Sequence, residues 1–281
     1  MHRLVRQAAV AAGIALGVAC ASHAPAPAAA PAAVAAAPTR PLHLFLLAGQ
    51  SNLAGRGYVE PEDRVPHARV WMLDANGRWV PAVDPVHFDK PKAAGVGPAR
   101  GFTNAIADCD TTIEIGLVPT AVGGSAISAW MPGAADPATH THPYDDALGR
   151  ARRAMRDGRF DAILWHQGES DANPRAAPEY EARLRAVVAR FRADLGDSTL
   201  PVIVGEVGHF ADRPWTPPRD SVTAATRRVA ATTPNMAFVS SEGLEHRGDS
   251  LHFSARAARE LGRRYAAAYR TLGRACGGAR P

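Results

Sequence analysis

Two parts of the chain carry the residue types of a covalent ester hydrolase. Ser51 directly follows an apolar run and a glycine, which places its hydroxyl in a tight turn where it can be exposed. Asp249 and His252 are three residues apart on a predicted loop, so they can share a hydrogen bond that fixes the imidazole tautomer. We predict Ser51 as nucleophile, His252 as its base and Asp249 as the group that orients the base. Taken alone, Ser51 is equally well explained as a helix cap.

Candidate donors to an oxyanion occur in two further segments. Gly123 and Gly124 follow a predicted strand and let the backbone approach a ligand closely. The N–H of Gly124 can then donate to an oxyanion, although a plain turn is the alternative. Gln167 follows another predicted strand and can supply a side-chain N–H to the same oxygen. Gly124 and Gln167 are therefore candidate oxyanion donors.

The polar run Trp165-His-Gln-Gly-Glu-Ser-Asp171 is unusually long for the end of a strand. Glu169 and Asp171 are acids near the predicted site, and holding loops together is favoured over a reactive role for both. His166 directly follows the strand, and we predict a structural role for it. The sequence has no CxxC pair and no cysteine–histidine cluster, so it predicts neither a metal nor a cofactor.

Alternating strand and helix patterns predict where these segments lie. Short apolar runs predict five buried strands, at 42–47, 113–118, 162–165, 202–207 and 236–239. Apolar residues at the helical period predict helices at 101–110, 144–157, 179–195, 221–232 and 255–272. This alternation favours a parallel sheet covered on both faces, with functional groups at the carboxyl ends of the strands. A separate small hairpin is predicted around Asp74–Gly77, because its Asn-Gly pair is a strong turn signal.

Five blocks of the sequence, in this order, resemble those of a known family. They are Gly49–Gly57, Gly95–Pro98, the segment from Leu117 to Trp130, Trp165–Asp171 and Asp249–His252. Over residues 42–272 the chain resembles the SGNH hydrolases, and within them carbohydrate esterase family 6 and the sialate O-acetylesterase-like group. Leu53 stands where this group usually has methionine, and Gln167 stands where the wider superfamily has asparagine.

The resemblance implies an α/β fold, a three-layer α/β/α sandwich of the flavodoxin-like SGNH type with a five-stranded parallel sheet. It implies the same triad, with Ser51, Gly124 and Gln167 as oxyanion donors. The expected substrate is an acetylated carbohydrate, and neither nucleic acid nor a cofactor is expected. The predicted substrate-binding residues are Asn52, Arg56, Trp130 and Glu169, with burial of Trp130 as the alternative to its stacking on a sugar.

Other functions stay open at this point. One alternative is an SGNH lipase or thioesterase acting on other acyl esters, although the sequence lacks the long apolar lid that such enzymes often need. Another is a catalytically inactive carbohydrate-binding module, against which the complete set of Ser51, Asp249 and His252 argues. A flavodoxin-like phosphate binder is disfavoured, because no glycine-rich phosphate loop occurs.

The first forty residues are typical of export and tethering. Two arginines followed by an apolar run predict a signal peptide over residues 1–20. The segment ending at Cys20 resembles a bacterial lipobox, which would make Cys20 a lipid anchor, while nearby small residues equally suit ordinary signal peptidase. Residues 21–40, mostly Ala and Pro, predict a linker, and 41–281 an esterase domain. The expected location is the periplasm, the outer membrane as a lipoprotein, or the outside of the cell.

The cysteine content and the net charge bear on the redox state of the protein and on whether it binds nucleic acid. In an oxidising compartment Cys109 and Cys276 either pair or stay as free thiols. The net charge is +5, of which three arginines in residues 1–40 supply +3, so the remainder carries only +2. Because the other arginines are interspersed with acids, solvated helix faces are favoured over a nucleic-acid footprint.

Overall fold

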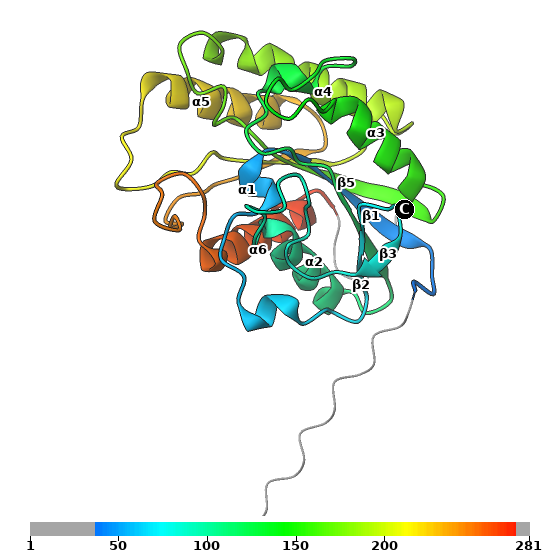
Figure 1. Ribbon diagram of the computed structural model, residues 1–281. Helices are drawn as coiled ribbons and strands as arrows, with labels where there is room; N and C mark the ends of the chain where they lie inside the picture. Colours follow the sequence, from blue (N-terminus) through cyan, green and yellow to red (C-terminus); the bar gives the residue numbers. More distant parts are fainter. Residues whose placement is uncertain (1–36, 274–281) are drawn as a thin grey trace, which may run out of the picture. The chain divides into compact units, whose positions relative to one another are not determined.

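A computed structural model describes residues 37–273 of the chain (Figure 1). Its centre is a seven-stranded sheet in the order β3-β2-β4-β1-β5-β6-β7. All neighbouring strands pair in parallel except β2 and β3, which pair antiparallel. The strands are β1 (Leu42–Gly49), β2 (Val70–Leu73), β3 (Trp79–Pro81), β4 (Glu114–Pro119), β5 (Gly158–His166), β6 (Val202–Gly205) and β7 (Met236–Val239).

The expected sheet of five strands is wrong in number, because the predicted hairpin belongs to the same sheet. The hairpin itself is present, with Asp74 Oδ1 accepting hydrogen bonds from the backbone N–H groups of Asn76 and Arg78. Val70 and Trp71 in β2 are each 1% exposed. A strand that apolar needs cover on both faces, so β2 pairs with β4 and carries β3 to the sheet edge.

Helices cover both faces of the sheet (Figure 1). Helices α2 and α6 lie against one face, and α3, α4 and α5 lie against the other. The described helices are α1 (Ser51–Ala54), α2 (Pro98–Cys109), α3 (Pro143–Ala154), α4 (Tyr180–Asp194), α5 (Pro217–Thr232) and α6 (Ala255–Thr271), with 3-10 turns η1 (Pro61–Arg64), η2 (Ile127–Trp130) and η3 (Ala177–Glu179). The predicted three-layer α/β/α sandwich is therefore confirmed.

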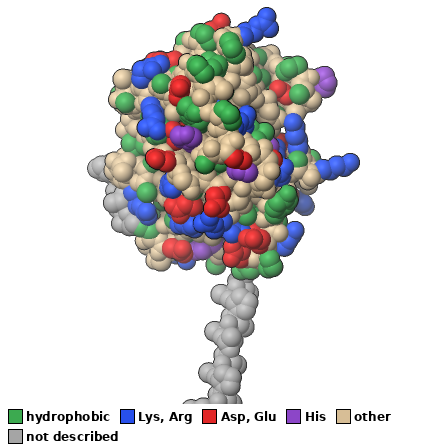
Figure 2. Space-filling model, turned by 90° about the vertical axis from the view of Figure 1, so that its left-hand side faces the viewer, with side chains coloured by type: hydrophobic (Ala, Val, Ile, Leu, Met, Phe, Trp, Pro, Cys, Tyr) green, Lys and Arg blue, Asp and Glu red, His purple; other side chains and the backbone are tan. Residues whose placement is uncertain are grey.

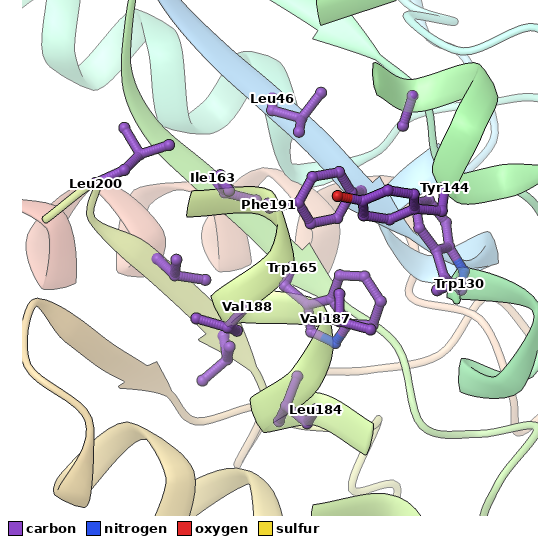
Figure 3. Packing of buried hydrophobic residues seen from close by; sticks show 14 of the residues in the cluster. Leu46, Trp130, Tyr144, Ile163, Trp165, Leu184, Val187, Val188, Phe191 and Leu200 are labelled. Atoms are coloured by element: carbon purple, nitrogen blue, oxygen red, sulfur yellow. The ribbon is translucent and has the colours of Figure 1, made fainter. Parts of the chain in front are cut away.

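Strand β1 shows why the sheet is buried on both faces. Its residues Leu42, Leu44 and Leu46 pack into the cluster beneath α3, α4 and α5, part of which Figure 3 shows. Phe45 and Leu47 point the other way and pack beneath α2 and α6. Side chains alternate across a strand, so a continuous apolar run fills both layers.

Three helices begin a few residues before their predicted starts. Each of α2, α3 and α5 has a proline in its first turn, Pro98, Pro143 and Pro217 respectively. Proline at this position has a suitable φ and lacks an N–H that would be unpaired, so it starts the helix before the apolar period becomes visible. Within residues 37–273, no helix is long and apolar enough to cross a bilayer.

The cysteines divide between described and undescribed residues. Cys109, the last residue of α2, is disulfide-bonded, which rules out the free-thiol alternative for this residue. Cys20 and Cys276 lie outside the described residues, as do the predicted signal peptide and most of the predicted linker.

Candidate active site

Ser51, His252 and Asp249 form a continuous line of hydrogen bonds. His252 Nε2 lies 3.0 Å from Ser51 Oγ, and His252 Nδ1 lies 2.8 Å from Asp249 Oδ2. The aspartate carboxylate can only accept, so Nδ1 carries the proton and Nε2 is left to accept from the serine hydroxyl. The structure therefore brings the three predicted catalytic residues together in the arrangement that activates a serine.

The turn between β1 and α1 places Ser51 at the carboxyl end of the central strand. Gly49 ends β1 with φ +137, and a Cβ at this position would lie 2.1 Å from the backbone oxygen of His166. Only glycine lets β1 and β5 approach this closely where the chain turns. Ser51 is 7% exposed and opens α1, so its hydroxyl is held in place with limited access to solvent.

The loop before α6 holds Asp249 in its ionised form. Burial by itself raises the pKa of Asp249, but hydrogen bonds from the backbone and side chain of His252, from Arg247 and from the Leu251 N–H together hold that pKa well below its usual range. The helix that follows has its own cap, since Ser254 accepts from the Ala257 N–H. Asp249 is therefore free to orient the histidine.

The loop after β4 brings the predicted oxyanion donors toward the serine turn. Val122 donates from its N–H to Gly49 O at 2.9 Å, and Ser170 Oγ donates to Gly124 O at 2.9 Å. Within residues 37–273, the N–H groups of Ser51 and Gly124 donate no hydrogen bond to the protein. Gly124 has φ +85, a conformation that favours glycine. These two N–H groups are available to an incoming oxygen atom, as an oxyanion hole requires.

Gln167 lies behind this loop and not in the open part of the site. It is fully buried, and its Nε2 contacts Gln50 Oε1 at 3.2 Å, Ser125 O at 3.1 Å and Asp171 Oδ2 at 2.6 Å. An amide nitrogen carries two hydrogens, so these three acceptors already engage both. The role of Gln167 as a third oxyanion donor stays a prediction, and its bonds in the structure hold the surrounding loops together.

Arg56 is buried and supports the loop that carries Gly124, and its contact with substrate stays a prediction. It is 5% exposed, and its Nη2 donates to Asp89 Oδ2 at 2.7 Å. The same carboxylate oxygen accepts the Gly123 N–H at 2.8 Å. Burial raises the pKa of Asp89, but the Arg56 charge and these hydrogen bonds outweigh it and hold that pKa below its usual range. The Arg56–Asp89 pair therefore fixes the residue next to Gly124.

Trp130 is a core residue, so it cannot stack on a substrate. Its side chain is fully buried, packs edge-on against Trp165 with ring centres 5.2 Å apart, and donates from Nε1 to Ser125 Oγ at 2.9 Å (Figure 3). Tyr58 is the exposed aromatic residue beside the site, with Arg247 Cζ 5.6 Å from its ring centre. Of the alternatives open for Trp130, burial is the one that the structure supports.

Asn52 and Glu169 complete the four predicted substrate-binding residues, and both face inward. Asn52 is 3% exposed, and the Glu169 side chain is 5% exposed. Asn52 Nδ2 donates to Glu169 Oε1 at 2.6 Å. Asn52 and Glu169, which follow β1 and β5, thus form contacts between loops. The sequence alone does not reveal that these two side chains contact each other.

The remaining acidic and histidine residues of the 165–171 segment have internal partners. His166 is fully buried with Nδ1 3.1 Å from Tyr265 Oη, and burial lowers its pKa. Asp171 Oδ2 accepts from the Ile127 N–H at 2.8 Å as well as from Gln167, and burial raises the pKa of this carboxyl group. Both residues hold loops and lie beneath the reacting groups.

A cavity of about 600 Å³ borders the loop that carries Asp249 and His252. His246 lines it and accepts hydrogen bonds at Nδ1 from the N–H groups of Gly248 and Ser250. Figure 2 shows basic, acidic and histidine side chains interspersed over this side of the molecule, with no large patch of one charge.

Three functional side chains are not predicted from the sequence, namely Arg247, Gln50 and Asp89. Arg247 contacts Asp249, and its place two residues before that aspartate is a signal that could have indicated it. Gln50 Oε1 accepts from the N–H groups of Gly168 and Ser170 at 3.4 Å and 3.3 Å. Asp89 gives no local signal, because its partners come from two distant loops.

Comparison with known proteins identifies the family and fold that this chain matches. Residues 41–271 match the family described as carbohydrate esterase, sialic acid-specific acetylesterase. The chain is 31% identical over 257 residues to a probable carbohydrate esterase of Arabidopsis thaliana, covering 83% of this chain and 92% of that protein. The crystal structure of that Arabidopsis protein superimposes with a TM-score of 0.72, at 30% identity over 82% of this chain and 98% of the other.

Two more distant structures share the fold. A carbohydrate acetylesterase from Xanthomonas citri has a TM-score of 0.65 at 20% identity, covering 82% of this chain and 56% of that one. The structure of NanS has a TM-score of 0.65 at 19% identity, covering 85% of this chain and 99% of that one.

Proposed function

We propose that this carboxylic ester hydrolase removes O-acetyl groups from sugars through an acyl-enzyme on Ser51. The chain belongs to the family described as carbohydrate esterase, sialic acid-specific acetylesterase, and this membership supports the proposed substrate class. The observation that carries the mechanism is the unbroken line from Ser51 Oγ through His252 to Asp249, with spacings of 3.0 Å and 2.8 Å. The backbone N–H groups of Ser51 and Gly124 lie beside it and donate to no described residue, so they can stabilise the negative charge of the tetrahedral intermediate.

In the first step Ser51 Oγ attacks the carbonyl carbon of the acetyl ester. The hydroxyl proton passes to His252 Nε2, and Asp249 stabilises the imidazolium that forms. The negative charge moves to the former carbonyl oxygen, where the N–H groups of Ser51 and Gly124 donate to it. When this intermediate collapses, the bond to the sugar oxygen breaks, and His252 returns the proton to that oxygen. The products are a free sugar hydroxyl and an acetylated serine.

In the second step water replaces the sugar. His252, now neutral, takes a proton from the water molecule as its oxygen attacks the acetyl-serine carbonyl. The oxyanion again forms beside the N–H groups of Ser51 and Gly124, and its collapse breaks the bond to Ser51 Oγ. His252 gives the proton back to the serine, and acetate leaves.

Replacement of the nucleophile tests this function. We expect Ser51→Ala to lower the turnover of p-nitrophenyl acetate by roughly 10⁴-fold or more, and to abolish labelling by a fluorophosphonate probe. The same preparations are then tested for acetate release from acetylated xylan and from O-acetylated sialic acid. Wild-type activity in Ser51→Ala would overturn the mechanism. A wild-type protein that binds sugars but takes no label would instead support the binding-module alternative.

We also infer that the protein is exported and held at a membrane through Cys20. This proposal is supported by the signal-peptide pattern of residues 1–20 and by the disulfide at Cys109, since structural disulfides persist mainly in oxidising compartments. Metabolic labelling with a radioactive fatty acid tests the anchor. The wild-type protein should take up label and Cys20→Ser should not, whereas an unlabelled wild type would favour free secretion.

A further inference from the structure

Asn52 joins the nucleophile turn to both neighbours of the catalytic histidine. Its Oδ1 accepts the Phe253 N–H at 3.1 Å, and its Nδ2 donates to Leu251 O at 3.1 Å. Leu251 and Phe253 stand directly before and after His252, 199 and 201 residues further along the chain than Asn52. One side chain, attached next to Ser51, therefore grips the backbone on either side of the base.

The other hydrogen bonds of His252 do not perform this function. The His252 N–H donates to Asp249 Oδ1, and His252 O accepts from the Arg247 N–H, both within the same loop. These bonds shape the loop and leave its distance from β1 undetermined. A second link, from Arg247 Nη1 to Arg56 O at 2.8 Å, lies five residues away from the base. Phe253 also packs against the rings of His166 and Phe210, and Asn52 is the side chain that hydrogen-bonds this segment to the turn of Ser51.

Glu169 fixes which way the Asn52 amide faces. A carboxylate offers acceptors only, so the amide nitrogen must turn toward Glu169 Oε1, 2.6 Å away. This orientation leaves Oδ1 facing the Phe253 N–H and the second Nδ2 hydrogen facing Leu251 O. Each hydrogen-bonding group of the Asn52 side chain is then satisfied. Glu169 belongs to the loop after β5, so three loops meet at this one amide.

We propose that Asn52 and Glu169 are a positioning pair that holds His252 within hydrogen-bonding distance of Ser51. Neither side chain touches the substrate, and both act through the imidazole. The proposal rests on the proposed function, since Asn52 and Glu169 affect the reaction only if His252 is the base that activates Ser51. A displacement of about 1 Å at a catalytic group costs on the order of 10²-fold in rate, which sets the size of the expected effect.

The test measures kcat and KM on p-nitrophenyl acetate for four variants. Asn52→Ala should lower kcat by about 10²-fold while KM changes by less than about threefold. Asn52→Asp places a second carboxylate against Glu169 and should lose at least as much. The double variant Asn52→Asp with Glu169→Gln restores the hydrogen bond between the two side chains with donor and acceptor exchanged. Leu251 O still lacks its donor, because a carboxylate has no N–H, so the rescue is partial and should regain about tenfold over Asn52→Asp. Glu169→Gln alone keeps an acceptor oxygen and should lose less than Asn52→Ala.

Asn235→Ala is the matched control. Asn235 donates from Nδ2 to Thr199 O at 3.0 Å next to the start of β7, at the end of the sheet opposite the triad. This variant should lower the melting temperature and leave kcat unchanged. Labelling of Ser51 by a fluorophosphonate should slow in Asn52→Ala and not in Asn235→Ala.

Three outcomes would overturn the proposal. They are a kcat within threefold of wild type in Asn52→Ala, a loss in KM instead of kcat, and a double variant no better than Asn52→Asp. The last comparison uses side chains of nearly the same size, so it decides the question even if Asn52→Ala does not fold. Ser51→Ala separates the two hypotheses. If it is inactive while Asn52→Ala matches wild type, only the positioning role fails; if it is active, both fail.

Discussion

Arg247 donates from Nε to Asp249 Oδ2 at 2.8 Å, on the same oxygen that lies 2.8 Å from His252 Nδ1. The orienting aspartate therefore serves two cationic or potentially cationic partners at once. Arg247 also donates from Nη1 to Arg56 O at 2.8 Å, so it links the base loop to the loop beneath the oxyanion donors. This arginine is placed to tune the charge of the triad without touching the substrate.

Removing Arg247 should make the folded protein lose stability at a higher pH as the solution is acidified. Its hydrogen bond helps to hold the pKa of Asp249 below the usual range, so ionised Asp249 stabilises the folded site above that pKa and the benefit is lost as the pH falls through it. In Arg247→Gln the folded-state pKa rises, and this loss begins at a higher pH. We expect the midpoint of acid unfolding, followed by circular dichroism, to shift upward by up to about one pH unit.

Arg256→Gln is the control for this pH profile. Arg256 is exposed and pairs with Glu245 on the surface, so its removal should leave the midpoint of acid unfolding in place. Equal acid-unfolding profiles for wild type and Arg247→Gln below about pH 5 would contradict the tuning role.

The order of the reacting groups is readable from the sequence, but their supports are not. Ser51, Gly124 and the Asp249–His252 pair stand at turns that follow strands or precede the last helix, and the parallel sheet must bring those turns to one edge. Asn52, Arg56 and Glu169 stand in the same turns, yet their side chains point inward. Which loops meet, and therefore which polar groups satisfy one another, depends on tertiary contacts between residues far apart in the chain.

The fold shows the same division between local and tertiary information. The period of apolar residues predicts the helices that flank the sheet, because each buries one stripe. The pairing of β2 with β4 is not visible in the local pattern, since Val70–Leu73 read equally as one arm of a free hairpin. In the folded chain, the burial of Trp71 between the sheet and the helices favours the pairing of β2 with β4.

Substitutions at Trp130 and at Tyr58 should have opposite effects, the first on stability and the second on the KM for a sugar substrate. Trp130→Phe removes the indole N–H that donates to Ser125 Oγ and leaves a gap in the core, so the free energy of unfolding should fall by about 1–3 kcal/mol with KM unchanged. Tyr58 is 70% exposed beside Arg247, so Tyr58→Ala should barely change stability. It should raise KM for an acetylated oligosaccharide and leave KM for p-nitrophenyl acetate unchanged.

Chemical unfolding and steady-state kinetics on both substrates separate these effects. The interpretation of Trp130 as a core residue would be lost if Trp130→Phe raised KM for the oligosaccharide alone.

Gln167→Met should affect stability as well as turnover. The substitution keeps the length of the side chain but removes the N–H groups that reach Gln50 Oε1, Ser125 O and Asp171 Oδ2. Buried acceptors left without a donor cost about 1–3 kcal/mol, so the free energy of unfolding should fall by that amount. A donor that acts only on the oxyanion would instead lower kcat by about 10²–10³-fold with no change in stability. Urea unfolding and kcat, measured on one preparation, distinguish the two roles.

Gly123 should tolerate no side chain, because the Arg56–Asp89 pair occupies the space beside it. A Cβ on Gly123 would lie 2.3 Å from Arg56 Nη2 and 2.9 Å from Asp89 Oδ2, and both of those side chains are only 4% exposed. In Gly123→Ala the ion pair must move, and the bond from the Gly123 N–H to Asp89 weakens with it. The adjacent N–H of Gly124 then leaves its position, so kcat on p-nitrophenyl acetate should fall by about 10²-fold with a small change in KM.

Gly149→Ala is the matched control for this glycine, because it adds the same methyl group where there is room. Gly149 lies within α3, and a Cβ there meets no described atom within 4 Å. Alanine should stabilise the helix by roughly 0.5–1 kcal/mol and leave kcat unchanged. If Gly123→Ala kept the wild-type kcat while Gly149→Ala behaved as expected, the loop after β4 would not supply an oxyanion donor. The remaining donors would then be the Ser51 N–H and a rearranged Gln167.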